Sequence, residues 1–222
     1  PWMPRCVENF GYQKDVDYVT YRIHVPSKIP ETYTRLHERI RKRGSLEVIE
    51  PGSKKEAAAW AKPAFRLMNA VFTQEGIYGY APMEDDEIDG LVQRYMPLLD
   101  PRFLKGIRHD DELAGFVIGI PDMTEGIRRA RGRLFPFGFL KILKARKNAR
   151  QLDLLLGAIK PEHRGKGGDV LMMVAMGMSV IQAGMKVIDT HHQMESNKKM
   201  RAVSELLGGE VYKRHRVYRK AL

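Results

Sequence analysis

One segment, Leu152-Asp-Leu-Leu-Leu-Gly-Ala-Ile-Lys-Pro-Glu-His-Arg-Gly-Lys-Gly-Gly-Asp169, carries the strongest structural signal in the chain. Its apolar first half, residues 152–159, predicts a buried strand. Pro161 and three glycines, at positions 165, 167 and 168, then end that strand. Apolar residues at positions 170, 171, 174, 178 and 181 fall on one face of a following helix. The segment therefore predicts a strand, a glycine-rich turn and a helix start.

Such a turn is suited to holding a pyrophosphate. Glycines let backbone N–H groups approach a ligand closely, and a helix N-terminus attracts an anion. Arg164 and Lys166 add positive charge to the same turn. Its spacing matches neither the dinucleotide fingerprint nor the Walker pattern. The alternative is a basic glycine turn that binds no ligand.

The run Ile159-Lys-Pro-Glu-His-Arg-Gly-Lys-Gly167 resembles the acyl-CoA-binding motif of the GNAT acetyltransferase superfamily. Farther along, Glu195-Ser-Asn197 and Leu207-Gly208 are similar to the family's later strand–Asn–helix–Leu-Gly segment. The resemblance covers about residues 45–222 and is concentrated in residues 152–220. It implies an α/β fold with a central mixed, mostly antiparallel sheet flanked by helices. It also implies transfer of an acetyl or longer acyl group from acetyl-CoA or another acyl-CoA to an amine.

The resemblance implies which residues bind the acyl-CoA. The pyrophosphate would lie against the backbone of residues 164–169, and the pantetheine arm along the strand edge at residues 157–159. The N–H of Gly157 would face the thioester oxygen. The implied cofactor-binding residues are Gly157, Ala158, Ile159, Arg164, Gly165, Lys166, Gly167, Gly168, Asp169 and Asn197. Asp169 departs from the family, which usually has a small residue there.

An amine acceptor must lose a proton during the reaction, so a base is needed within reach. The preferred candidate is Glu195, because it lies next to the family's Asn position. Asp153 is the second candidate, since it lies four residues before Gly157 and therefore on the same face of a regular strand. Asp189 on the following predicted strand is a further carboxylate. Solvated strand edges are the alternative explanation for all three.

The general acid is left open by the sequence. Many family members carry a Tyr seven residues after the Asn, and this chain has Ser204 there. Tyr218 and Tyr212 are the candidate replacements, and both could equally be core aromatics. Ser204 and Asp169 also support an alternative function, a degenerate module that binds CoA or a partner without catalysis.

Composition limits the class of protein. With 222 residues, 43% of them hydrophobic, the chain can bury one full core. Its apolar runs are too short to span a membrane, and no signal-peptide pattern is present. The single cysteine, Cys6, fits a cytoplasmic location, and no His/Cys cluster has the spacing of a metal site. Because the chain begins at Pro1, we expect it to be a piece of something longer.

The domain organisation is predicted from three segments. Residues 1–26 are predicted to be the remnant of a preceding, acyltransferase-like domain, because a Gly-aromatic pair at 11–12 precedes a strand-like run; an ordinary N-terminal strand is the alternative. Residues 27–44 are predicted to form a linker helix, and residues 45–222 the GNAT-like domain. Contact with a preceding tandem domain follows from this organisation.

Charge is unevenly distributed along the chain, which carries a net charge of +11. Residues 123–150, a predicted helical insertion, hold nine Lys/Arg against Glu125 alone. This block favours a CoA phosphate clamp, an acidic acceptor or an anionic membrane surface; a solvated face is the alternative. We expect a small-molecule or lipid-linked amine acceptor and no nucleic acid, because no RNA-binding motif interleaves aromatics with the basic blocks. The acceptor's identity, the acyl length and the oligomeric state are left open.

Overall fold

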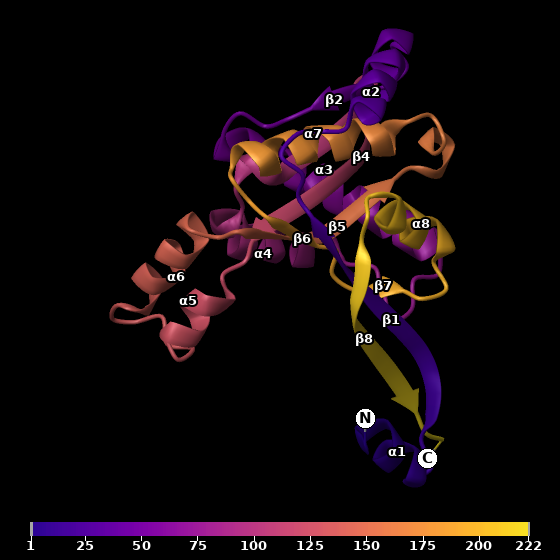
Figure 1. Cartoon of the computed structure of the whole chain (residues 1–222), viewed down its shortest axis with the longest axis vertical. Coiled ribbons are helices and arrows are strands. Elements are labelled where there is room, and N and C mark those ends of the chain that lie inside the picture. Colours follow the sequence, from indigo (N-terminus) through magenta and orange to yellow (C-terminus); the bar gives the residue numbers. More distant parts are fainter. Residues whose placement is uncertain (1, 222) are drawn as a thin grey trace. The chain divides into compact units, whose positions relative to one another are not determined.

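The protein is described from a computed structural model, which covers residues 2–221 and divides into two compact units. Among the described residues, unit 1 consists of residues 2–24 and 189–221, and unit 2 consists of residues 25–188. Figure 1 labels the helices and strands of both units.

Unit 2 contains a sheet with the strand order β2-β3-β4-β5-β6. Its strands are β2 (Glu47–Ile49), β3 (Leu104–His109), β4 (Glu112–Pro121), β5 (Gln151–Ile159) and β6 (Val187–Asp189), the last ending at the unit boundary. Neighbours from β2 to β5 are antiparallel. Strands β3 and β4 form a hairpin, and Asp110 in its turn has the positive φ, 52°, that aspartate tolerates better than most residues.

Unit 2 also contains six helices. They are α2 (Glu31–Arg43), α3 (Lys54–Gln74), α4 (Asp85–Tyr95), α5 (Thr124–Arg129), α6 (Gly138–Lys147) and α7 (Gly168–Gln182), with short 3-10 turns η1 (Met96–Leu98), η2 (Pro101–Phe103) and η3 (Pro161–His163). Helix α3 begins at Ser53, whose hydroxyl accepts a hydrogen bond from the Glu56 N–H. Helix α2 ends at Gly44 in the left-handed conformation, as its sequence predicts.

The two faces can be assigned from adjacent residues of β4. Phe116 packs in a core cluster with α3 residues such as Leu67 and Met68. Its neighbour Val117 packs instead against clusters that include α7 residues such as Leu171. Because successive strand residues point to opposite faces, α3 lies on one face of the sheet and α7 on the other.

Unit 1 is built around a long strand. Strand β1 (Gln13–His24) pairs antiparallel with β7 (Gln193–Met194) and with β8 (Glu210–Arg219), and the unit also holds α1 (Trp2–Asn9) and α8 (Lys198–Leu206). Figure 1 shows β1 and β8 as a two-stranded ribbon with α1 at its end. The sequence predicts a closing strand pair over residues 209–220, whereas the structure has one strand there. Residues 210–219 contain no Gly, Pro, Asn or Asp to form a turn, so the segment stays extended and pairs with β1.

The chain thus has the predicted α/β fold, a mixed, mostly antiparallel sheet flanked by helices. The basic insertion forms the two short helices α5 and α6 that its sequence predicts. Among residues 2–221, no helix is both long and apolar enough to cross a membrane. The predicted domain boundaries at residues 26 and 44 stay predictions.

Candidate functional site

The glycine-rich loop runs from the end of β5 to the start of α7 and is closed by Arg164. The Arg164 Nε donates a hydrogen bond of 3.1 Å to the Ile159 carbonyl, and its guanidinium also forms an ion pair with Glu75. Lys166 is exposed beside it. Arg164 therefore joins the loop to the end of β5 and to the C-terminal end of α3.

The three loop glycines serve different purposes. Gly165 has a φ of +70°, and a Cβ there would meet nothing within 4 Å, so backbone conformation alone favours glycine. Gly167 has a φ of +90°, and a Cβ would come within 2.5 Å of Ile40 Cδ1 in α2. A Cβ on Gly168 would collide with Ile107 in β3. Gly167 and Gly168 thus allow α7 to pack closely against α2 and the sheet.

His163 lies at the base of the loop and is buried. Its Nδ1 has no hydrogen-bond partner among the described residues, and its ring stacks on His109 with centroids 4.5 Å apart. Burial lowers the pKa of His163, and the neighbouring His109 and Lys166 lower it further. The imidazole is therefore held in its neutral form at a pH where an exposed histidine is half protonated.

Strand β5 contains a bulge that changes the predicted orientation of Asp153. On β4, Ile118 pairs with Leu156 and Ile120 pairs with Asp153, so Leu155 is an extra residue on β5. Asp153 therefore shares a face with Leu156, and the side-chain position of Gly157 points to the opposite face. The expectation that Asp153 and Gly157 share a face is wrong, because the bulge breaks the two-residue period. The Asp153 carboxylate accepts a hydrogen bond of 2.8 Å from Gln151.

The predicted site residues Glu195, Asn197 and Tyr218 belong to unit 1. Glu195 forms an ion pair of 2.6 Å with Arg214. Asn197 caps α8, and its side-chain oxygen accepts a 3.2 Å hydrogen bond from the Met200 N–H. The Tyr218 hydroxyl donates to Glu8 over 3.2 Å.

Glu195 and Tyr218 lie far apart within unit 1. Tyr218 pairs with Lys14 on β1, whereas Met194, which precedes Glu195, pairs with Tyr18. Four residues along a strand correspond to about 14 Å. The structure therefore does not bring the proposed acid Tyr218 beside the proposed base Glu195.

Ser204 and Tyr212 have their own partners in unit 1. Ser204 is a buried residue of α8 and exchanges hydrogen bonds with the Gln193 side chain, the shorter one 2.9 Å. The Tyr212 hydroxyl donates to Asp189. Burial would by itself raise the pKa of Asp189, but the bonds from Tyr212 and from the His191 N–H lower it overall. Asp189 is therefore a carboxylate held in its ionised form.

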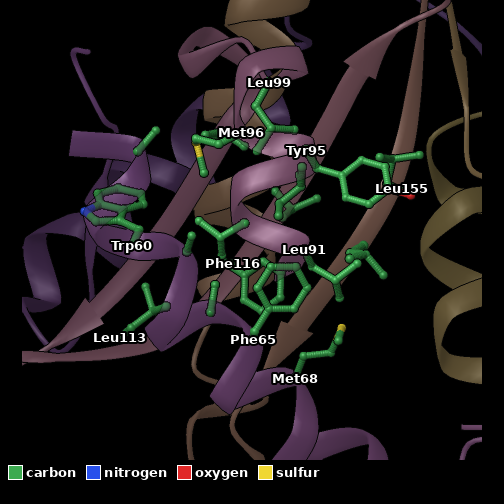
Figure 2. A pocket seen from close by; sticks show the side chains of 18 of the residues that line it. Trp60, Phe65, Met68, Leu91, Tyr95, Met96, Leu99, Leu113, Phe116 and Leu155 are labelled. Carbon is green, nitrogen blue, oxygen red and sulfur yellow. The ribbon is translucent and has the colours of Figure 1, made fainter. Parts of the chain in front are cut away.

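A large apolar cavity, which the sequence analysis misses, lies between α3, α4 and the sheet within unit 2 (Figure 2). Its volume is about 460 Å³. Trp60 and Phe65 line it from α3, Tyr95 from α4, Phe116 from β4 and Leu155 from β5. The lining contains one charged residue, Lys105, whose buried ammonium pairs with Glu50. Such a lining suits an aliphatic chain and disfavours a polar ligand.

The sequence does hold a weak signal of this cavity. Helix α3 carries three small residues at the spacing of one helical face, Ala57, Ala61 and Ala64, all buried and all in the cavity wall. Small residues leave room where larger ones would fill the space between helix and sheet. Among the described residues, no cluster of His, Cys, Asp and Glu is arranged to hold a metal ion.

No protein-family model matches the chain. It is 29% identical to a bacterial ceramide synthase from Caulobacter vibrioides over 226 residues, 97% of this chain and 57% of that protein. It is 22% identical to the protein YghO of Escherichia coli over 229 residues, again 57% of that protein. The chain therefore spans little more than half the length of these two curated relatives. A shorter alignment, 32% identical over 139 residues, covers 55% of the chain and 46% of the tyrosine recombinase XerC of Pseudomonas aeruginosa.

Solved structures resemble nearly the whole chain. A GCN5-related N-acetyltransferase from Sphaerobacter thermophilus matches 98% of this chain and 55% of its own, with a TM-score of 0.60 and 14% identity. A tandem GNAT protein from the clavulanic acid biosynthesis pathway matches 98% of this chain and 58% of its own, with a TM-score of 0.56 and 15% identity. This likeness in fold covers both units and includes β5, the glycine-rich loop and α7. The chain has the fold of the GNAT acetyltransferases.

Proposed function

We propose that the chain is part of an N-acyltransferase that transfers a long aliphatic acyl group from acyl-CoA to an amine. The observation that carries the proposal is the position of the apolar cavity. Leu155 and Leu156 in its wall directly precede Gly157, and Val117, the β4 partner of Gly157, also lines it. If the thioester lies at Gly157, as in the family resemblance, its acyl chain has this cavity beside it.

The cavity would make chain length the main determinant of donor affinity. Its volume of about 460 Å³ falls within the usual range of ligand pockets, roughly 300–1,000 Å³. Each methylene removed from water contributes about 0.8 kcal/mol. An acetyl group would use little of that free energy, so a longer acyl-CoA is the better substrate.

The proposed binding site for the pyrophosphate of acyl-CoA is the loop at the start of α7. Backbone N–H groups of residues 164–169 would face the pyrophosphate, with Lys166 and Arg164 as cationic neighbours. Asn197 belongs to unit 1, where its side chain caps α8, and it is not part of this proposed loop site. Asp169 is exposed in the first turn of α7, where its negative charge interacts favourably with the helix dipole but would repel a phosphate.

The reaction needs a base and an acid. The amine nitrogen attacks the thioester carbon, the C–S bond breaks, and the thiolate leaves with a proton. Glu195 is the proposed base for the ammonium proton, whereas Asp153 lies on the face opposite Gly157 and Tyr218 lies about 14 Å from Glu195 along the strands, so neither is proposed as its partner. Because Glu195 is paired with Arg214, an acceptor amine would have to displace that arginine before the carboxylate could act as the base.

The acceptor class comes from the relative named a ceramide synthase. A ceramide is a fatty-acid amide of a long-chain amino alcohol, which fits an amine acceptor that is itself a lipid. We therefore propose a long-chain amino alcohol as the acceptor.

Donor binding tests the proposal. Calorimetry with CoA, acetyl-CoA and a long-chain acyl-CoA below its micelle concentration should show affinity rising steeply with chain length. Ala61→Leu, which fills the cavity from α3, should reduce the preference for the long chain by tenfold or more and leave CoA binding unchanged.

The matched control is Ala59→Leu, on the exposed side of the same helix. It should keep the wild-type preference, and thermal unfolding should show both variants folded. Equal affinity for acetyl-CoA and the long-chain donor, or a preference that Ala61→Leu leaves intact, would contradict the cavity's proposed role.

A non-catalytic CoA-binding module is the second candidate function, favoured by the buried Ser204 where many family members have an acidic Tyr. Turnover separates the two. Release of free CoA in the presence of a long-chain amino alcohol should fall about 10²-fold in Glu195→Gln if that residue is the base. Tight acyl-CoA binding with no release of CoA by the wild type would favour the second candidate.

A further inference from the structure

The basic insertion forms a compact helical hairpin. Helices α5 and α6 pack side by side (Figure 1). Gly126 makes this possible, because a Cβ there would come within 2.7 Å of the Ala145 Cβ and the Ile142 Cα. Gly138 likewise has no room for a side chain against the Arg133 carbonyl. The hairpin is therefore a defined platform that holds its surface residues in fixed positions.

This platform exposes a concentration of large apolar side chains. Seven of the eighteen exposed large hydrophobic residues in the described chain belong to residues 123–150. Phe135 and Phe137, in the connection between the helices, are 81% and 67% exposed. The others are Ile127, Leu134, Phe139, Leu140 and Leu143. A patch of this kind marks an interaction surface.

Cations surround the apolar residues. Arg128 and Arg129 pair with Glu125, and Arg146 lies 3.8 Å from Asp100. The remaining basic side chains of the hairpin itself have no carboxylate within ion-pair distance among residues 2–221; they are Arg131, Arg133, Lys141, Lys144 and Lys147. On α6, Lys144 and Lys147 follow Leu140 and Leu143 by four residues, so each cation sits beside an exposed leucine.

Exposed phenylalanines next to unneutralised cations fit an anionic bilayer. Its acyl region accepts aromatic and aliphatic side chains, while its phosphate layer attracts Lys and Arg, whose long stems lie along apolar surface. A protein interface would have few charges at its centre, and a nucleic-acid duplex would leave the phenylalanines in water. We propose that the α5–α6 hairpin docks on an anionic lipid surface and inserts Phe135 and Phe137 below the headgroups. This inference does not depend on the proposed acyltransferase activity.

Vesicle co-sedimentation tests the proposal. The protein should bind vesicles of phosphatidylcholine with about a third phosphatidylglycerol and should bind pure phosphatidylcholine at least tenfold more weakly. Phe135→Ser with Phe137→Ser should weaken binding to anionic vesicles about tenfold, because the apolar contribution is lost. Arg131→Glu with Arg133→Glu should do the same through charge and should remove most of the salt dependence.

The matched control reverses two exposed cations elsewhere, Arg39→Glu with Lys42→Glu on α2. It changes the net charge equally and should leave vesicle binding within about twofold of wild type. Circular dichroism checks that each variant is folded. Membrane docking is overturned if the phenylalanine pair has no effect, if the α2 control weakens binding as much as the hairpin variant, or if a duplex DNA competes away all vesicle binding.

Discussion

His163 is a buried histidine whose charged form the fold disfavours. It is 9% exposed, and its Nδ1 has no hydrogen-bond partner among the described residues. Burial is the largest cause of its lowered pKa, followed by His109 and Lys166, with Glu162 opposing them. Its position between β5 and the start of α7 means that protonation there would disturb the loop proposed to bind the pyrophosphate.

The lowered pKa of His163 predicts a loss of stability in mild acid. The folded state keeps the imidazole neutral, so its contribution is complete above the unfolded pKa of about 6.5 and is lost as pH falls through the lower folded pKa. In His163→Phe, the free energy of unfolding should fall less between pH 7.5 and pH 5.5 than in the wild type. Urea denaturation at several pH values measures this. Parallel curves for the two proteins would contradict the assignment.

Arg164 belongs to the glycine-rich sequence motif, and its side chain has defined partners in the structure. Its guanidinium is paired with Glu75, so a phosphate would have to compete with that carboxylate. Arg164→Ala should raise the Kd for CoA by roughly 10- to 100-fold, the range of a charge-assisted hydrogen bond. Glu75→Gln should instead lower the Kd severalfold by freeing the guanidinium.

Calorimetric titration of CoA into Arg164→Ala and Glu75→Gln shows whether the Arg164 guanidinium binds CoA or only holds the loop in place. Arg164→Lys serves as the control, because it keeps the charge and loses the fork geometry. An unchanged Kd in Arg164→Ala and Glu75→Gln would restrict Arg164 to its hydrogen bond with the Ile159 carbonyl.

At the scale of elements, the strand–turn–helix of residues 152–182 was the most predictable part of the chain. Its apolar run, its glycines and its helical period all indicate the same structure, which the bounds of β5 and α7 confirm. The bulge at Leu155 could not be predicted, because it depends on the pairing of β5 with β4 and has no local sequence signal. That one extra residue turns Asp153 away from the face expected of it.

The pairing of β1 with β8 was likewise beyond the sequence pattern. Their partners lie about 200 residues apart, and loop closure over that distance leaves no local trace. The residues that hold the ribbon can be named only from the structure. Asp17 pairs with Arg216 directly across the strands, through bonds of 2.7 and 3.0 Å.

This ion pair predicts an acid-sensitive ribbon. Hydrogen bonding to Arg216 lowers the pKa of Asp17 to about 2. The stabilisation is therefore complete above the unfolded pKa of about 3.8 and is lost as pH falls toward 2. In Asp17→Asn, amides of β8 should exchange with solvent severalfold faster at pH 7, and the difference from wild type should disappear near pH 2.

Hydrogen exchange followed by mass spectrometry on peptides from β8 measures this effect. Asp15→Asn on the same strand is the control, since the Asp15 carboxylate is 3.9 Å from Arg219. It should change exchange less. Equal effects of the two substitutions would show that strand pairing, rather than the Asp17–Arg216 pair, protects β8.

At the scale of the whole molecule, the sequence predicts the fold class and the glycine-rich loop but not the cavity. The cavity wall combines residues from α3, α4, β3, β4 and β5, spread over about 100 positions, and each is an ordinary core residue by itself. The empty space between them is a property of packing. The net charge of the whole protein, by contrast, is visible in the sequence, and its value of +11 predicts attraction for an anionic donor.

Charge and cavity should therefore contribute to donor affinity in separable ways. CoA is an anion, so its Kd should rise with salt as the Debye length falls from about 10 Å at 0.1 M to about 3 Å at 1 M. An uncharged acyl chain in the cavity is not screened, and salts that strengthen apolar burial can only increase its contribution. The ratio of Kd values for acetyl-CoA and a long-chain acyl-CoA should stay constant or grow across that range.

Titrations at four salt concentrations test this, with Ala61→Leu lowering the ratio at every concentration. The same titrations show where the acyl chain binds, because the α5–α6 hairpin offers a competing apolar surface surrounded by cations. Binding there would depend on those cations, so the ratio would fall as salt rises and would be sensitive to Phe135→Ser with Phe137→Ser. A ratio that is insensitive to salt and to the hairpin variant, but sensitive to Ala61→Leu, assigns the acyl chain to the cavity between α3, α4 and the sheet.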